Sequence, residues 1–382
     1  MLRTLLTAIA FASACWMAIA CAADNATESA TESTTDSAAP YHVGEIMRVV
    51  HPAAARDWRG AQTEALITRI WFPVAAASPE QPHEIGAPGV PLFRGHGIAG
   101  DAPLSDAREK YPLLLLSHGT GGSADSLDWL ASAFAARGYI VAGVNHPGNN
   151  AIEPTTREGF MLWWERATDV SEVLDNLLAD PTLGARIDKD RIGAVGFSLG
   201  GYTVLELAGA RTRQQRFLDF CASPAADAIC KPPEMARLKG PAPTLATLSP
   251  QTRASMAHSG DSYRDPRIRA VFAIAPALGE AFDATSFAEV SIPVMLVAGK
   301  LDPIAPVDTN ILRIASLMPR AKVNMVPDAA HYTFLDDCLP GVDDHLALIC
   351  KDSAGANRDA VHAQTIDWAL AFFASTLPAT PL

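Results

Sequence analysis

The sequence predicts an α/β protein with a doubly wound, mostly parallel sheet, and two observations carry this prediction. Short apolar runs alternate with helical patterns through the middle of the chain, and the run at 112–117 (PLLLLS) fits a strand buried on both faces of a parallel sheet. The second observation is a G-x-S-x-G turn at Gly196, Ser198 and Gly200, which lies between an apolar run and a helical segment.

The individual elements follow from the same patterns, and we expect the folded part to begin near Tyr41. The expected strands cover residues 65–73, 112–117, 139–144, 192–195, 268–275, 292–298 and 322–326. The expected helices cover residues 124–137, 161–179, 201–210, 311–318 and 359–377. The stretch 75–111 is rich in Pro and Gly, so we expect it to form loops.

The alternation of strand and helix breaks after the helix that follows Ser198. Residues 211–266 form a Pro-, Ala- and Ser-rich insertion, which we expect to fold as a cap over the carboxyl ends of the strands. The insertion carries eight Lys and Arg against five Asp and Glu, in a chain whose formal charge is −12. It is either a solvated surface segment or a positively charged cover that attracts anionic esters.

The N-terminal segment resembles an export signal. Arg3 is the only charge before Asp24, the residues between them are mostly apolar or small, and residues 18–22 contain two small-x-small cleavage patterns. We therefore predict a signal peptide at 1–22, a disordered linker at 23–40, one domain at 41–382, and a periplasmic or secreted protein. A retained membrane anchor and a lipoprotein acylated at Cys21 are the alternatives.

The cysteines fit an exported chain. Six are present, and four of them lie beyond the leader, namely Cys221, Cys230, Cys338 and Cys350. An even number in an exported protein predicts disulfides, for which the sequence allows three connectivities. The nearest-neighbour pairing, Cys221 with Cys230 and Cys338 with Cys350, is the simplest.

Binding sites of several kinds are not indicated. The sequence has no spacing typical of zinc ligands, no phosphate loop and no dinucleotide-binding glycine pattern, so we expect neither metal nor cofactor. The net charge of −12 speaks against a nucleic-acid partner, which would require a basic face. The oligomeric state is left open.

The turn at Ser198 predicts a nucleophile, because such a turn holds the serine hydroxyl exposed above the sheet. A serine needs a histidine to accept its proton, and the histidine needs an acid to orient it. Asp302 and His331 each follow an expected strand, in the chain order usual for such sheets. The competing residues are Asp328 as the acid and His345 and His362 as the base.

Two backbone N–H groups are expected to hold the oxyanion that forms during acyl transfer. Leu199, the residue after the nucleophile, supplies one. The other is assigned to Thr120, in the glycine-rich loop after the strand at 112–117. His118 is interpreted as a buried residue that braces this loop, and His146 and Asn149 are expected at the mouth of the pocket.

Five motifs together resemble the α/β-hydrolases of the platelet-activating-factor acetylhydrolase-like and predicted dienelactone hydrolase group. These motifs are SHGTGG (117–122), NHPG (145–148), GFSLGG (196–201), GKLD (299–302) and AHYTF (330–334). The resemblance implies the α/β-hydrolase fold, a serine esterase with Ser198, Asp302 and His331 as its triad, and oxyanion donors at Thr120 and Leu199. Dienelactone hydrolases themselves use a cysteine nucleophile, where this chain has Ser198.

The leading hypothesis is an exported serine carboxylic ester hydrolase that acts through an acyl-enzyme on small or short-acyl esters, phospholipid-type esters included. A polyester or cutinase-like hydrolase and a serine peptidase are the enzymatic alternatives. The alternative outside enzymes is a binding protein that kept a hydrolase fold, and such a protein would be expected to lack one of Ser198, Asp302 or His331.

Overall fold

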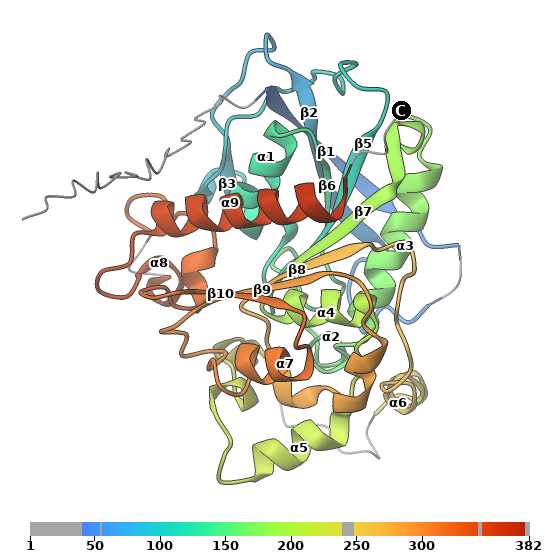
Figure 1. Ribbon diagram of the computed structural model, residues 1–382, viewed down its shortest axis with the longest axis vertical. Coiled ribbons are helices and arrows are strands. Elements are labelled where there is room, and N and C mark those ends of the chain that lie inside the picture. Colours follow the sequence, from blue (N-terminus) through green and yellow to red (C-terminus); the bar gives the residue numbers. More distant parts are fainter. Residues whose placement is uncertain (1–39, 54–55, 239–247, 343–345, 379–382) are drawn as a thin grey trace, which may run out of the picture. The chain divides into compact units, whose positions relative to one another are not determined.

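A single eight-stranded sheet organises the part of the chain that the computed structural model describes, which is residues 40–53, 56–238, 248–342 and 346–378 (Figure 1). Its strand order is β1-β2-β6-β5-β7-β8-β9-β10. The strands are β1 (Tyr41–Val50), β2 (Leu66–Ala75), β5 (Tyr111–Ser117), β6 (Ile140–Val144), β7 (Ile187–Phe197), β8 (Ala270–Ile274), β9 (Val294–Gly299) and β10 (Lys322–Val326). The predicted signal peptide, Cys21 and nearly all of the predicted linker lie outside the described residues.

Helices cover both faces of this sheet, as the apolar run of β5 requires. The neighbours in the row β6-β5-β7-β8-β9-β10 all pair in parallel. β2 pairs antiparallel with β1 on one side and with β6 on the other. Leu114 and Leu116 of β5 pack in the core under α1 (Asp128–Ala136) and α9 (Arg358–Thr376). Leu113 and Leu115 point the other way, because side chains alternate along a strand, and pack in the core under α3 (Glu165–Ala179), α4 (Leu199–Ala208) and α7 (Ile311–Leu317). The predicted doubly wound fold is therefore confirmed.

Two expectations about local structure are wrong. The stretch 75–111 contains an antiparallel hairpin, β3 (Glu84–Ala87) with β4 (Val90–Arg94), whose turn contains Gly89 at φ 75°. The glycines here mark a tight turn between two short strands. The hairpin lies outside the main sheet, so its strands lack the long apolar runs by which the other strands were predicted.

The helix expected at 161–179 is interrupted, because α2 (Arg157–Met161) ends before α3 begins at Glu165. The break contains two adjacent tryptophans, whose rings meet edge-on at 6.1 Å but whose other contacts differ. The Trp164 ring is fully buried and its indole N–H donates to Ser255 Oγ at 2.9 Å. The Trp163 ring instead meets the ring of Phe217 edge-on at 5.1 Å.

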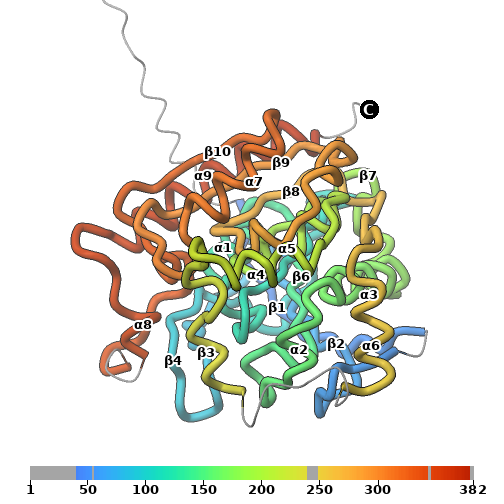
Figure 2. Tube along the Cα trace, turned by 90° about the horizontal axis from the view of Figure 1, so that it is seen from below, coloured from blue at the N-terminus to red at the C-terminus, as the bar shows by residue number. Residues whose placement is uncertain are grey.

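The insertion after α4 is built from short elements, and its residues 239–247 lie outside the described part. It contains α5 (Gln214–Ala222), two 3-10 turns, η3 (Ala228–Cys230) and η4 (Pro233–Arg237), and α6 (Pro250–Ala257). Figure 2 shows α5 and the chain after it lying in front of α4, with the β3–β4 hairpin to one side and α2 to the other.

Both cysteine pairs adopt the nearest-neighbour arrangement. Cys221 at the end of α5 is bonded to Cys230 of η3, with Cα atoms 5.5 Å apart. Cys338 is bonded to Cys350, the last residue of α8 (Ala347–Cys350), with Cα atoms 5.6 Å apart. Within the described ranges, no helix combines the length and the apolar character that a membrane crossing requires.

The helix that follows Ser198 carries a buried acid, Glu206, that forms no ion pair with any Lys or Arg in the described ranges. Glu206 Oε1 accepts hydrogen bonds from the hydroxyls of Tyr202 and Thr212, each at 2.7 Å. Its other carboxylate oxygen has no protein partner among the described residues. Burial raises the pKa of Glu206 to about 8 even though these two hydroxyls lower it, and Glu165 raises it further.

This raised pKa predicts how stability depends on pH. The folded protein holds a proton on Glu206 that the unfolded chain loses near pH 4.5, so the stabilisation is complete below pH 4.5 and is lost as the pH rises toward 8. Glu206→Gln should therefore raise the melting temperature relative to the native protein by an amount that grows between pH 5 and pH 8. Thermal unfolding across this range tests it, with the exposed Glu289→Gln as control. A difference that is constant with pH would contradict a protonated Glu206.

Candidate active site

Ser198 lies on a sharp turn between β7 and α4, in a conformation that non-glycine residues rarely adopt (φ 55°, ψ −118°). The glycines on either side make this turn sterically possible. A Cβ atom on Gly196 would lie 2.0 Å from the carbonyl oxygen of Gly200, and a Cβ on Gly200 would lie 1.8 Å from the carbonyl oxygen of Ser117. The backbone N–H of Ser198 donates to Ile274 O at 2.8 Å, which ties the turn to β8.

The structure brings Ser198, His331 and Asp302 into one hydrogen-bonded line. Ser198 Oγ is 2.9 Å from His331 Nε2, and His331 Nδ1 is 2.7 Å from Asp302 Oδ2. Asp302 follows β9 and His331 follows β10, so both come from the carboxyl ends of the last two strands of the sheet order. Because a carboxylate can only accept, Nδ1 carries the ring proton and Nε2 is free to accept the serine proton.

The surroundings hold this line in place. Asp302 Oδ1 accepts from the backbone N–H groups of Ile304 and Ala305 at 2.9 and 2.8 Å, so both of its oxygens are occupied. The His331 ring is 1% exposed and lies against the ring of Phe197 at a centroid distance of 4.9 Å. The histidine therefore has one orientation, with Nε2 toward Ser198.

The predicted oxyanion donors lie on either side of the serine. Leu199 begins α4, where backbone N–H groups have no partner within the helix. Gly119 approaches the nucleophile closely, since a Cβ atom there would lie 3.2 Å from Ser198 Cβ, and this places Thr120 beside the turn. Within the described part of the chain, the backbone N–H groups of Thr120 and Leu199 have no protein acceptor. Both donors are available to a ligand.

The competing residues lie elsewhere. His362 is stacked on Trp129 at 3.9 Å, and its Nε2 faces Thr333 O at 3.0 Å. Burial, with Arg358 nearby, lowers the pKa of His362 to about 4. Asp328 is exposed at the surface and His345 lies outside the described residues. Neither Asp328 nor His362 contacts Ser198 among the described residues.

A buried polar cluster beneath the loop 118–121 escaped prediction. His118 Nδ1–H donates to Gly119 O at 2.6 Å, and its Nε2 accepts from the backbone N–H of His146 at 3.2 Å. His146 Nδ1–H donates in turn to Asp169 Oδ2 at 2.8 Å, while its Nε2 accepts from Ser117 Oγ at 2.9 Å. His118 braces the loop, as expected.

His146 and Asn149, however, do not line the mouth of the pocket, because both are buried behind this loop. Asn149 Oδ1 accepts from the N–H of Gly121 at 2.7 Å, and its amide group donates to Gly159 O at 3.1 Å. The NHPG motif, which contains His146, and Asn149 directly after it therefore support the loop from behind. The polar groups of both side chains form hydrogen bonds with residues that the sequence pattern does not indicate as partners.

Three arginines supply the charge of the buried cluster. Arg59 donates to Asp169 Oδ2 at 2.6 Å, Arg56 pairs with Asp169 Oδ1, and Arg166 donates to His118 O. Burial alone would raise the pKa of Asp169, but Arg59, Arg56 and His146 outweigh it and hold that pKa well below its usual range.

The bases in the cluster respond in the opposite direction. Burial, reinforced by Arg166, lowers the pKa of His146 to about 3 and holds that of His118 well below its usual range. Burial also lowers the pKa of Arg166 to about 9. Both histidines are therefore neutral at pH 7, and they serve as fixed donors and acceptors rather than as proton carriers.

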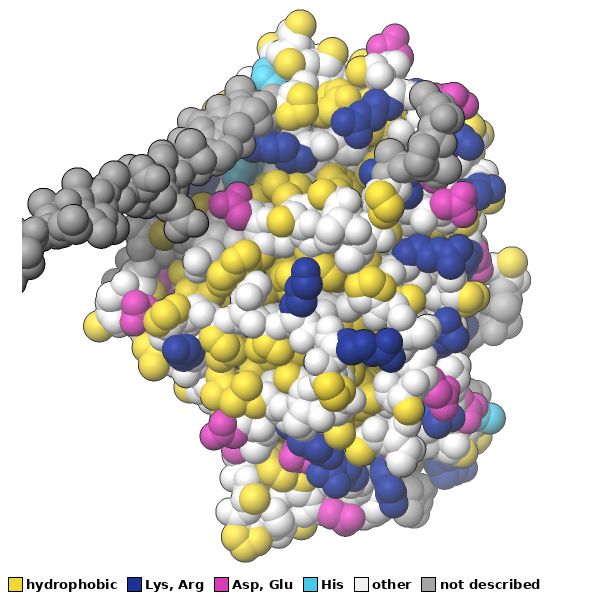
Figure 3. Space-filling view, viewed as in Figure 1, with side chains coloured by type: hydrophobic (Ala, Val, Ile, Leu, Met, Phe, Trp, Pro, Cys, Tyr) yellow, Lys and Arg dark blue, Asp and Glu magenta, His cyan; other side chains and the backbone are white. Residues whose placement is uncertain are grey.

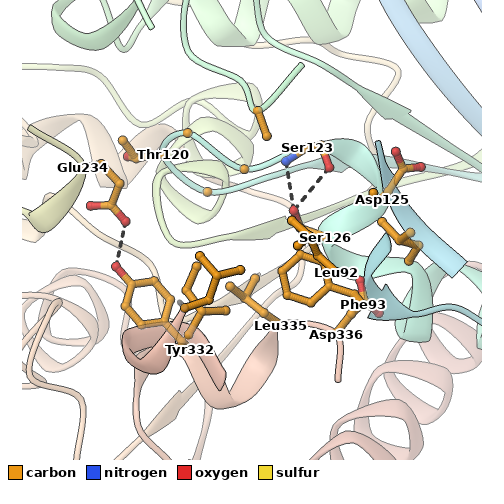
Figure 4. Close-up of a pocket in the computed structure, with 18 of the residues that line it drawn as sticks. Leu92, Phe93, Thr120, Ser123, Asp125, Ser126, Glu234, Tyr332, Leu335 and Asp336 are labelled. Carbon is orange, nitrogen blue, oxygen red and sulfur yellow. Dashed lines mark hydrogen bonds between the residues drawn. The ribbon is translucent and has the colours of Figure 1, made fainter. Parts of the chain in front are cut away.

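Two cavities meet at Ser198. The larger, about 600 Å³, is walled by the β3–β4 hairpin, the loop 119–123 and the segment after His331. The smaller, about 250 Å³, is walled by the insertion, the end of α2 and the segments around Leu278 and Ile304. Figure 4 shows part of the larger cavity, with Leu92, Phe93 and Leu335 close together and the Tyr332 hydroxyl directed at the carboxylate of Glu234.

The positive charge of the insertion does not gather at this site. Arg211 pairs with Glu289 at 3.0 Å and Arg216 pairs with Glu280. Figure 3 likewise shows acidic side chains among the basic ones at the lower end of the molecule. Among the described Lys and Arg of the insertion, Arg237 is the one that lines a cavity at Ser198.

The fold, the strained serine turn and the Ser–His–Asp line are together the features of a hydrolase of the α/β class. A comparison with protein families agrees: the family described as "Alpha/beta hydrolase family" matches residues 113–340. The chain belongs to the alpha/beta hydrolase family.

The relatives found by sequence comparison match less than half of this chain. A protein named "Putative esterase NocK" from Nocardia uniformis subsp. tsuyamanensis is 32% identical over 185 residues, 46% of this chain and 48% of that protein. Platelet-activating factor acetylhydrolase from Canis lupus familiaris is 27% identical over 169 residues, 32% of this chain and 37% of that protein. The chain thus spans about a third to a half of the length of these relatives.

A solved structure shows the fold over nearly the whole chain. A ferulic acid esterase from Streptomyces cinnamoneus superposes with a TM-score of 0.55 and 18% identity, covering 90% of this chain and 92% of its own.

The buried cluster leads to a prediction about stability. Asp169→Asn removes the carboxylate that Arg56 and Arg59 share, so it should lower the free energy of unfolding by about 3–5 kcal/mol at pH 7. Asp175→Asn lies on the same helix, where the Asp175 side chain is 66% exposed and pairs with Arg267, and it should cost less than about 1 kcal/mol. Denaturant unfolding of the two variants measures the difference. Equal losses would show that the buried cluster is not a principal support of the fold.

Proposed function

We propose that the protein is an exported serine carboxylic ester hydrolase, with Ser198 as the nucleophile, His331 as the general base and Asp302 as the residue that orients the histidine. The observation that carries the proposal is the line from Ser198 Oγ to His331 Nε2 to Asp302, at 2.9 and 2.7 Å, on a strained turn between two cavities. A turn that sterically demands glycine at 196 and 200 is difficult to explain unless the serine must be presented to a ligand.

The first half-reaction follows from this geometry. Ser198 Oγ attacks the carbonyl carbon of the ester while His331 Nε2 takes the hydroxyl proton. The negative oxygen that forms is held by the backbone N–H groups of Thr120 and Leu199. The carbon–oxygen bond to the alcohol then breaks, and the proton on Nε2 passes to the departing oxygen. Asp302 stabilises the imidazolium that exists between these two proton transfers.

The second half-reaction reverses the roles. Water enters where the alcohol left, His331 takes one of its protons, and the oxygen attacks the acyl carbon bonded to Ser198. The same two N–H groups hold the second oxyanion. Its collapse releases the acid and returns the proton to Ser198 Oγ. The residues of this chain therefore account for every proton transfer in ester hydrolysis.

Export is the second part of the proposal. Residues 1–22 have the composition of a signal peptide, and residues 23–40 that of a linker. The disulfides Cys221–Cys230 and Cys338–Cys350 support a mature protein of an oxidising compartment, the periplasm or the outside of the cell. The insertion at 211–266 is the cap of the domain at 41–382, because it supplies walls to the cavities at Ser198.

The test is removal of the nucleophile. Ser198→Ala should lower kcat for short-chain esters by several orders of magnitude, since nucleophile, base and acid act as a unit, while the melting temperature changes little. Ser316→Ala, an exposed serine on α7, is the control and should retain full activity. A fluorophosphonate probe should label the native protein at Ser198 and fail to label Ser198→Ala. Native protein that is folded yet neither hydrolyses esters nor takes the label would instead be a binding protein.

A further inference from the structure

The two cavities differ in which part of the catalytic line they reach. Both are lined by Thr120, Ser198 and Glu234. His331 lines the larger cavity, and Leu199 lines the smaller one. The reacting serine thus has the histidine on one side and the first residue of α4 on the other.

This asymmetry assigns the two halves of an ester. The departing alcohol oxygen must receive its proton from His331 Nε2, so the alcohol has to lie on the side that His331 lines. The carbonyl oxygen lies between the N–H groups of Thr120 and Leu199, which directs the acyl chain to the opposite side. Resting on the proposed function, we infer that the cavity of about 250 Å³ holds the acyl group and the cavity of about 600 Å³ holds the alcohol.

The lining of the acyl cavity is mainly apolar, and a disulfide forms part of its wall. Trp163 and Phe217 meet edge-on at 5.1 Å and form one side of it, and Leu218 of α5 lies on the outer side. The Cys221–Cys230 disulfide, which joins α5 to η3, also lines the cavity. Because this bond joins α5 to η3, these two parts of the outer wall cannot move apart to admit a longer chain. The insertion therefore determines the size of the acid.

The volume indicates the class of acid. An apolar cavity of about 150 Å³ is enough to bind benzene. A cavity of about 250 Å³ therefore accommodates a single ring with a short linker, or a short aliphatic chain, and excludes a long fatty acyl chain. The described residues that line it include no Lys or Arg, so a second carboxylate on the acid would meet no cation there.

The alcohol side has much more room. The larger cavity adjoins another of about 690 Å³, and the two share Leu92, Ala151 and Arg237. Arg237 donates to Gly121 O at 3.0 Å, which holds the insertion against the loop that carries Thr120. The substrate class that fits is an ester of a compact apolar acid, aromatic or short-chain, with a larger alcohol.

Glu234 separates the two sides. Tyr332, the residue after the catalytic histidine, donates to Glu234 Oε1 at 2.6 Å, and Glu234 lines both cavities. The contact, drawn as a dashed line in Figure 4, joins the insertion to the segment that begins at His331. An ester bound across Ser198 has its two halves on different sides of this contact.

Two matched variants test the assignment. Leu218 lines the acyl cavity and is 51% exposed, and Ile152 lines the alcohol cavity and is 53% exposed, so tryptophan at either position fills cavity volume without disturbing a core. Leu312→Trp, at a site 43% exposed on α7 that lines neither cavity, is the control. The substrates are ethyl esters of acetic, hexanoic and 3-phenylpropanoic acid, and acetate esters of ethanol, hexanol and 2-naphthylethanol.

In the acyl series, Leu218→Trp should lower the ratio of kcat/KM for the 3-phenylpropanoate to that for the acetate at least tenfold, with the ratios in the alcohol series unchanged. Ile152→Trp should lower the ratio of kcat/KM for the 2-naphthylethyl acetate to that for ethyl acetate at least tenfold, with the ratios in the acyl series unchanged. Leu312→Trp should change no ratio in either series. The exchanged pattern, or unchanged ratios in both folded variants, would overturn the assignment. Activity that survives Ser198→Ala, or native protein inactive on every ester, would instead defeat the proposed function itself.

Deacylation provides a second readout that does not depend on substrate affinity. Once the alcohol has left, only the acyl group remains on Ser198, and water enters through the alcohol side whichever acyl group is bound. The ratio of the deacylation rate constants of two different acyl groups therefore reports on the acyl cavity. In pre-steady-state bursts with 4-nitrophenyl 3-phenylpropanoate and 4-nitrophenyl acetate, Leu218→Trp should change the ratio of the two deacylation rate constants, and Ile152→Trp should leave this ratio unchanged. A change of this ratio by Ile152→Trp alone would show that the acyl group lies in the larger cavity and would overturn the assignment.

Discussion

The backbone of Ser198 is the constraint on which the rest of the site depends. A φ of 55° is unfavourable for a serine, and this conformation persists because the packing of the chain on both sides prevents the backbone from relaxing. Atoms of β5, β7 and α4 lie so close together that Gly196 and Gly200 have no room for a Cβ atom. This close approach starts α4 directly beneath the serine and points the first N–H groups of the helix at the position where charge develops during acyl transfer. The close packing at Gly196 and Gly200 is thus needed both for the fold and for the position of the serine.

The second support is electrostatic and lies behind the loop that carries Thr120. Asp169, the arginines and the two neutral histidines form a buried set in which each hydrogen bond fixes the next. Burying this much charge is costly, and the cost is offset only while the partners stay in position. The loop 118–121 therefore has little freedom, and one predicted oxyanion donor belongs to it. Preorganised donors of this kind need no rearrangement when the oxyanion forms.

The insertion contributes apolar walls to the site rather than an electrostatic attraction for anions. Its positive surplus suggested a cover that attracts anions, but Arg211 and Arg216 are paired with glutamates away from the serine. What the insertion brings to the site is an apolar wall, a disulfide and the Glu234–Tyr332 contact. Under the proposed assignment of the two cavities, specificity comes from their volumes and apolar surfaces on either side of Ser198.

Local patterns in the sequence determined most strands of the sheet, its doubly wound character, and the positions of Ser198, Asp302 and His331 after β7, β9 and β10. These features are readable because they rest on short-range sterics: a continuous apolar run, a glycine-bounded turn, and a strand followed at once by a polar residue. The hairpin β3–β4, the break at Leu162 and the cluster around Asp169 were not readable. Asp169 lies 110 residues from Arg59 along the chain, and only folding brings the two together. For the same reason the sequence indicated a serine with its partners, whereas the volumes on either side of that serine were decided by the tertiary structure, because they arise where segments remote in the chain pack against one another.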